Sequence, residues 1–131
     1  LAVVLLALLA TLSWGLWRRW RRRAVSRRAH GELLRLRQEW ERNADDSALV
    51  RGLSQLLRRM ALACYPRQQV AGLSGEAWLA FLDAHGGGGR FSKGSGRRLV
   101  DAPYRRDAAV PASELLELTR QWLTANREVG R

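Results

Sequence analysis

The chain has 131 residues, of which 23 are Lys or Arg and 12 are Asp or Glu, so its formal net charge is +11 at pH 7. This length suffices for one small domain, and the single cysteine, Cys64, excludes an internal disulfide and fits a reducing compartment. Seven of the basic residues and no acidic residue fall between Arg18 and Arg28. A collar beside anionic lipid therefore explains the excess charge better than a nucleic-acid-binding surface does.

The first seventeen residues, Leu1 to Trp17, carry no charged side chain. As a helix they would span roughly 26 Å, slightly less than the roughly 30 Å of a bilayer's hydrocarbon core. We therefore expect a transmembrane helix over 1–17 that has lost its first few residues, since the chain opens on Leu rather than Met. A core helix of a soluble protein is the alternative interpretation.

Arginines cluster directly after this apolar segment, on the side that bilayer helices leave in the cytoplasm. Tryptophans bracket the same boundary, where an amphipathic indole suits the headgroup layer, although they could also be plain apolar residues of the span. We therefore predict a single-pass protein with a cytoplasmic C-terminal domain. The residues expected at the membrane interface are Trp14, Trp17, Arg18, Arg19, Trp20, Arg21, Arg22 and Arg23.

The segment 18–43 is predicted to be a basic juxtamembrane helix. Leu33, Leu36 and Trp40 lie near one helical face, with Leu34 beside them. No proline interrupts the chain before residue 43, so the span can continue into the cytoplasm as one long helix.

Residues 44–131 are predicted to form a cytoplasmic helical domain. Asp45 or Asp46 can cap a helix over 47–65, which ends before Pro66. Its apolar side chains recur at three- and four-residue steps, while arginines take the polar side. The apolar set is Leu49, Leu53, Leu56, Leu57, Met60 and Cys64, and the polar set is Arg51, Arg58 and Arg59.

Three further helices are expected, over 75–85, 95–101 and 111–127. Ser74 is the expected N-cap of the first, and glycines at 86–89 stop it. The side chains expected inside are Trp78, Leu79, Phe81, Leu82, Leu115, Leu118, Trp122 and Leu123. No period-two pattern occurs, so we predict an all-α fold in which one membrane helix continues into the basic helix and then a small bundle.

The glycine-rich stretch 86–96 superficially resembles a phosphate-binding loop. A P-loop places its lysine after the last glycine and follows a buried strand, whereas Lys93 precedes Gly94 and no strand comes before. We favour an interhelical loop that is anchored by Phe91. The alternative is a nucleic-acid or anionic-ligand site; its residues would be Arg90, Lys93, Arg97 and Arg98.

Neither catalysis nor metal binding is supported by the pattern of titratable residues. His30 and His85 are distant in sequence, and Cys64 lies in an apolar run. Asp83 and His85 are expected at a solvated helix end, with no nucleophile–base spacing around them. We therefore expect no enzymatic activity, no cofactor and no metal.

Aromatic, proline and arginine residues gather where helices join. Their usual role is to fix turns, but Tyr and Arg are also enriched where interfaces are tight. The possible partner-binding residues are Tyr65, Arg67, Tyr104 and Arg105. The sequence leaves the oligomeric state open.

Two stretches make the chain recognisable: "LSQLLRRMALACYPRQQVAGLSGEAWLAFLDAHGGGGRF" over 53–91 and "LVDAPYRRDA" over 99–108. Together with the span and the basic collar, they resemble a bacterial family catalogued as domain of unknown function 4381. The resemblance covers essentially the whole chain. It implies genes encoded beside a MoxR-type AAA+ ATPase and membrane-anchored von Willebrand factor A-type proteins, in clusters associated with aerotolerance, stress or envelope functions. It carries over no catalytic residue.

The resemblance and the residues together predict a non-catalytic adaptor or accessory subunit in the bacterial inner membrane. Its expected partners are the lipid bilayer, the MoxR-type ATPase and the von Willebrand factor A-type proteins. The alternative is a membrane-tethered binder of nucleic acid or another anionic ligand through the basic glycine-rich loop.

Overall fold

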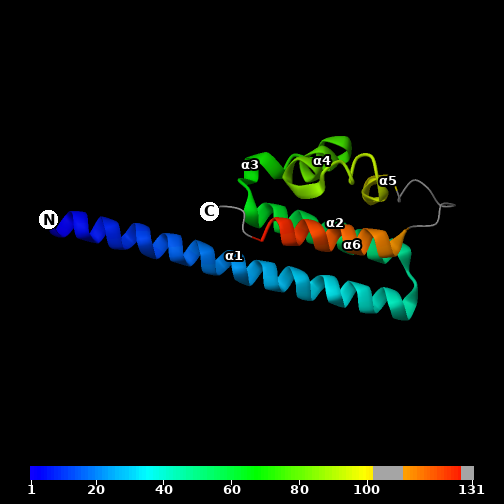
Figure 1. The fold of residues 1–131 in the computed structure, drawn as a ribbon, viewed down its shortest axis with the longest axis horizontal. Helices are drawn as coiled ribbons and strands as arrows, with labels where there is room; N and C mark the ends of the chain where they lie inside the picture. Colours follow the sequence, from blue (N-terminus) through cyan, green and yellow to red (C-terminus); the bar gives the residue numbers. More distant parts are fainter. Residues whose placement is uncertain (102–110, 128–131) are drawn as a thin grey trace.

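The computed structural model describes residues 1–101 and 111–127, and within these ranges it contains helices and turns but no strand (Figure 1). This confirms the all-α fold expected from the absence of a period-two pattern. The α-helices are α1 (Ala2–Asn43), α2 (Asp46–Cys64), α3 (Arg67–Val70), α4 (Gly75–Leu82), α5 (Arg98–Asp101) and α6 (Ala112–Ala125). A π-helical turn, η1 (Asp83–Gly87), follows α4, and a 3-10 turn, η2 (Ser95–Arg97), precedes α5.

Helix α1 is a single helix of 42 residues, about 63 Å long at 1.5 Å per residue. Residues 2–21 of this helix are exposed, and this part, which we call the apolar half, projects beyond the rest of the molecule (Figure 1). Its second half packs into the bundle and buries Ala29, Leu33 and Leu36. The apolar half is long enough to cross a membrane, and its continuation into the basic helix is as predicted.

A short turn joins α1 to α2. Ala44 takes the left-handed conformation, with φ 50°, and its N–H donates to the carbonyl of Trp40 at 2.7 Å. Asp45 caps α2, because its carboxylate accepts the N–H of Ala48 at 3.1 Å. Asp46 accepts the indole N–H of Trp40 at 2.8 Å. One aspartate is therefore the predicted cap, and the other ties the two helices together.

The core lies between α2, α4, α6 and the packed half of α1. All the apolar side chains predicted to face inward from the three main bundle helices are buried. Helix α6 runs parallel to α2 and antiparallel to α1 (Figure 1). The indole N–H of Trp122 donates to the carbonyl of Leu82 at 3.1 Å, which fixes α6 against the end of α4.

Arg58 departs from the sequence expectation. The apolar pattern predicts that Arg58 shares a polar face with Arg51 and Arg59, but its guanidinium lies 4.1 Å from the ring centroid of Trp78. It also donates hydrogen bonds to two carbonyls that close the segment between α3 and α4, those of Val70 at 3.2 Å and Leu73 at 2.8 Å. The guanidinium is planar, so it can stack on the indole and donate to the two carbonyls at the same time. These contacts stabilise the folded chain more than exposure of Arg58 to water would.

Helix α4 is shorter than predicted. Ser74 is its N-cap by backbone geometry, with φ −150° and ψ 163°, but its hydroxyl makes no capping hydrogen bond. The helix ends at Leu82 instead of residue 85, because the chain widens into η1 and reverses at Gly86, whose φ is 121°. The glycines therefore end the helical segment as expected, but its last turn is the π-helical η1, so the α-helix itself ends three residues before the predicted position.

We predict that Leu56→Asp unfolds the domain. Leu56 is only 4% exposed, so the substitution would bury an unpaired charge at a cost of roughly 3–5 kcal/mol. Gln55→Asp, at the exposed neighbouring position, is the matched control and should change stability by less than about 1 kcal/mol. Urea unfolding of the full chain in detergent, followed by circular dichroism, measures both. Equal midpoints for the two variants would show that this face of α2 does not pack as described.

Candidate functional site

A groove runs between α1 and α6 on the outside of the bundle. Its volume is about 340 Å³. The lining residues are His30, Leu33, Leu34, Arg37, Trp40 and Glu41 from α1 and Ser113, Leu116, Glu117 and Arg120 from α6. We call it the α1–α6 groove. It exists because α6 packs against α1 and α2 at once and leaves one flank of α1 uncovered.

The α1–α6 groove has an apolar floor and a charged rim. Leu34 remains 54% exposed, which is unusual for a leucine in the packed half of α1. Each rim pairs its own charges, since Arg37 lies 3.2 Å from Glu41 on α1 and Arg120 lies 2.5 Å from Glu117 on α6. The hydrogen bond from Arg120 holds the pKa of Glu117 below its usual range, so this carboxylate stays ionised near neutral pH. The rim is charged but locally balanced.

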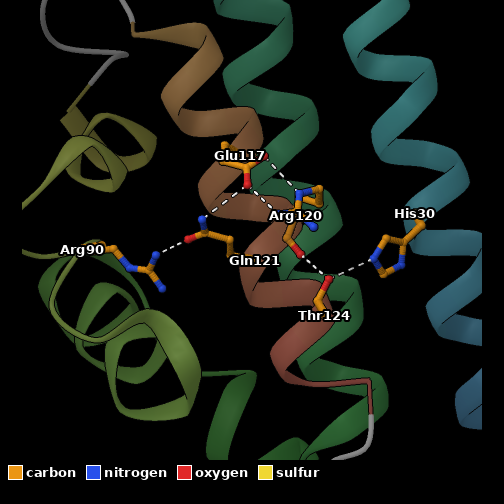
Figure 2. Close-up of polar contacts among 6 residues, drawn as sticks. All are labelled: His30, Arg90, Glu117, Arg120, Gln121 and Thr124. Carbon is orange, nitrogen blue, oxygen red and sulfur yellow. Dashed lines mark hydrogen bonds and ion pairs between the residues drawn. The ribbon is translucent and has the colours of Figure 1, made fainter.

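A series of hydrogen bonds along the exposed face of α6 links the glycine-rich loop to α1 (Figure 2). At the loop end of the series, Gln121 accepts from Arg90 and donates to Glu117 at 3.3 Å, and Glu117 in turn accepts from Arg120. Thr124 donates to the carbonyl of Arg120 at 2.9 Å and lies 3.5 Å from His30 Nε2. The wall that α6 contributes to the groove is therefore held by contacts within the chain.

The residues predicted for the membrane interface all lie on α1. Their described side chains are exposed; the side chain of Arg22 is not among those described. The rings of Trp14 and Trp17 lie 5.6 Å apart, and the guanidinium of Arg21 lies 5.3 Å from the Trp17 ring. Aromatic and cationic side chains are thus interspersed over residues 14–23, at the end of the apolar half.

Asp83 organises the glycine-rich loop. Its carboxylate accepts the N–H of Phe91 at 2.9 Å, the N–H of Ser92 at 3.1 Å and the Ser92 hydroxyl. The expectation of a solvated helix end is therefore wrong for Asp83, because the loop folds back over it. Burial alone would raise the pKa of this carboxyl, but these hydrogen bonds and one from Gly89 together lower it. Phe91 is fully buried and is the predicted anchor of the loop.

Two of the four basic residues of the alternative anion site, Arg90 and Arg97, are engaged by partners within the chain. Arg90 donates to the carbonyl of Gly87 at 2.9 Å, and Arg97 donates to Ser92 O at 3.0 Å and pairs with Glu76. Lys93 is exposed, whereas Arg98 is half-buried. Two of the loop's N–H groups already bind the Asp83 carboxylate. The loop therefore offers an external anion fewer free donors than its sequence suggests.

Tyr65 lies in a packed cluster. Its ring meets those of Phe81 and His85 edge-on, at centroid distances of 5.3 and 4.4 Å, and its hydroxyl donates to Asn126 Oδ1. Burial, with a smaller effect from Cys64, raises the pKa of Tyr65 to about 12. Arg67, at the start of α3, is exposed. The other two predicted partner-binding residues, Tyr104 and Arg105, lie outside the described residues, so a surface formed by all four stays a prediction.

The sequence matches the family described as domain of unknown function (DUF4381) over residues 1–125. The chain belongs to the DUF4381 family. No curated protein and no solved structure gives a significant match. The family description assigns no activity, so any function for this DUF4381 chain has to be argued from its own geometry.

Sequence reasoning missed two features of this DUF4381 chain. Asn126, only 1% exposed, donates to the carbonyls of His85 and Trp122, both at 2.8 Å, and so joins α6 to η1. The groove was missed because it depends on where α6 lies. One signal was present, since the adjacent residues Leu33 and Leu34 point about 100° apart on a helix and cannot both face one core.

No group of three metal-ligating side chains occurs among residues 1–101 and 111–127.

We expect Asp83→Asn to destabilise the DUF4381 domain by about 1–2 kcal/mol at pH 7, because it removes the charge from three hydrogen bonds. The folded-state pKa of Asp83 is lowered, so its contribution is complete above the unfolded-state pKa of about 3.9 and disappears as the pH falls through the folded value. Glu114→Gln, at an exposed position, is the charge-matched control. Thermal melting between pH 2.5 and 7 should show the difference between variant and parent shrinking as the pH falls below the unfolded-state value. A constant difference across that range would refute this role.

Proposed function

We propose that this chain is a non-catalytic, membrane-anchored adaptor or accessory subunit whose bundle presents the α1–α6 groove to a protein partner. The observation that carries the proposal is the division of α1 into an exposed apolar half and a half that packs into the bundle. Apolar surface costs about 25 cal/mol per Å² in water, so a helix exposed to this extent needs a covering environment. A bilayer supplies one along the whole length of the exposed half.

The proposed membrane is the bacterial inner membrane, with the bundle in the cytoplasm. Tryptophans at the end of the apolar half suit the headgroup layer, and the arginines after them favour the cytoplasmic side. Because α1 continues without a break, the bundle cannot swing freely about a linker. It is held at a set height above the lipid.

The α1–α6 groove is placed to receive protein rather than lipid. Along α1, His30 lies about 15 Å beyond Trp20 and Trp40 lies about 30 Å beyond it. Acyl chains do not extend that far from the bilayer. The apolar floor around Leu34, within a rim of balanced charge, fits an amphipathic segment that carries an apolar side chain between polar flanks.

The proposed mechanism is a raised local concentration. Two proteins confined to one membrane surface have a high effective concentration for each other, so a contact of low affinity in the groove is enough to keep them bound. The family resemblance suggests a MoxR-type AAA+ ATPase as the soluble partner and von Willebrand factor A-type proteins as membrane partners. Two side chains that could take part in catalysis have structural roles: Asp83 holds the glycine-rich loop, and Cys64 is buried in the core. This division supports a non-catalytic role.

Membrane anchorage and orientation are tested in the cells that express the chain. We expect the full chain to stay with the membrane pellet after alkaline carbonate treatment. Protease added outside sealed spheroplasts should spare a C-terminal tag, and the tag should be cut only after permeabilisation. A soluble chain, or a tag cut from outside, would contradict the proposal.

Docking in the α1–α6 groove is tested with Leu34→Glu. The substitution places a charge on the floor of the groove at a position exposed enough to leave the fold intact. Gln38→Glu adds the same charge to an exposed position of α1 outside the groove and is the control. From mild detergent extracts we expect the tagged parent and the control to recover the ATPase or a von Willebrand factor A-type protein. Recovery with Leu34→Glu should fall about tenfold or more.

Two results would count against docking in the groove. One is recovery of neither partner type by the parent chain under native expression. The other is equal recovery by parent and Leu34→Glu, which would move the contact to another face of the bundle. Melting temperatures of the two variants should agree within a few degrees, so that a loss of recovery reports binding.

A further inference from the structure

A second hollow opens beside the α1–α6 groove, on its membrane side. Its volume is about 580 Å³. The residues that line it are Trp20, Arg23, Ser26, Arg27, His30 and Arg127. His30 lines both hollows, so they adjoin along the same pair of helices. We call this second space the basic hollow.

Three guanidinium groups from two parts of the chain face the basic hollow. Arg23 and Arg27 are one helical turn apart on α1, whereas Arg127 follows the end of α6. Among residues 1–101 and 111–127, no carboxylate lines the space and none forms an ion pair with any of the three. Elsewhere on the same helices, Arg35, Arg37 and Arg120 all pair with glutamates. The basic hollow therefore differs in charge from the adjoining groove, whose two arginines, Arg37 and Arg120, are each paired.

The polar atoms of His30 are already engaged. Its Nδ1 lies 2.8 Å from the carbonyl of Ser26, and its Nε2 lies 3.5 Å from the Thr124 hydroxyl. His30 therefore forms a wall of the hollow, and the arginines are its charged donors. Three arginines that converge without a counter-charge repel one another, and a bound anion with several acceptor oxygens relieves that repulsion.

The height of the basic hollow above the apolar half identifies the anion. Trp20, 63% exposed, lines its lower edge, and Arg27 lies about 10 Å further along α1. If α1 crosses the bilayer as proposed, Trp20 and Arg23 at the lower edge of the hollow lie in the headgroup layer, where lipid phosphates are concentrated, and the long side chain of Arg27 can extend down to it. The exposed indole offers an amphipathic surface beside them.

We propose that the basic hollow binds the phosphate of an anionic phospholipid, held by Arg23, Arg27 and Arg127. This inference rests on the proposed membrane anchorage and adds a lipid site to it. A lipid clamped between α1 and the end of α6 fixes the rotation of the bundle about α1. The direction in which the α1–α6 groove opens over the membrane is set by the same contact.

The test is native mass spectrometry of the full chain in detergent, with phosphatidylglycerol or phosphatidylcholine titrated in. We expect the parent to retain phosphatidylglycerol at least tenfold better than phosphatidylcholine. Arg27→Gln with Arg127→Gln should weaken phosphatidylglycerol binding at least tenfold, because each substitution removes the donor of charge-assisted hydrogen bonds to the phosphate. Both residues are exposed, so the fold should survive.

The matched control is Arg18→Gln with Arg19→Gln, which removes the same charge from exposed positions outside the hollow. A specific site predicts that this control binds within twofold of the parent. Equal loss in both double variants would instead indicate attraction to the collar as a whole and would overturn the site.

Inorganic phosphate distinguishes a lipid from a free anion. We expect 10 mM phosphate to displace less than half of the bound phosphatidylglycerol, because the free anion has no contact with the indole and the apolar half of α1. Full displacement would assign the site to a soluble phosphate compound and overturn the lipid. Carbonate extraction separates the two proposals, since a chain that stays in the membrane but shows no lipid preference refutes only the lipid site.

Discussion

Helix α1 is one unbroken helix whose two halves lie in different environments: one half is exposed and apolar, and the other packs into the bundle. Its exposed apolar half is stable only if something covers it, whereas Leu33 and Leu36 in its other half are part of the core that holds α2 and α6. No interior proline divides these two tasks. The orientation of the bundle is therefore tied to the axis of the exposed half, and any surface on the bundle has a set height along that axis.

Helix α6 packs beside α1 and forms the second wall of the α1–α6 groove. It is anchored at its C-terminal end, where the Trp122 indole and the Asn126 amide donate to carbonyls of α4 and η1. With that end fixed, α6 lies along α1 instead of covering it, so Leu34 stays uncovered and His30 meets Thr124. The α1–α6 groove thus depends on contacts at the opposite side of α6 from the groove itself.

The helices were predictable from the sequence because their signals are local: apolar residues at three- and four-residue steps, an aspartate at a cap, and glycines at a stop. The roles of Arg58, Asp83 and Asn126 were not predictable, because they depend on partners 8 to 61 residues away that only the folded chain brings together. A polar residue at a helix end has the same local pattern whether it meets water or a buried carbonyl. The groove was out of reach for the same reason, since it depends on the spacing of two helices separated by most of the domain.

Charge divides the space between α1 and α6 into two parts with different chemistry. Of the described residues, three arginines and no carboxylate line the part near the apolar half, whereas Arg37 and Arg120 in the far part each pair with a glutamate on their own helix. Both parts share His30 as a wall, so the spacing of α1 and α6 affects both. Any ligand that changes this spacing at one part must change affinity at the other, and by linkage the effect is equal in both directions. A lipid at the membrane end would then act on partner binding through the same two helices that connect the bundle to the bilayer.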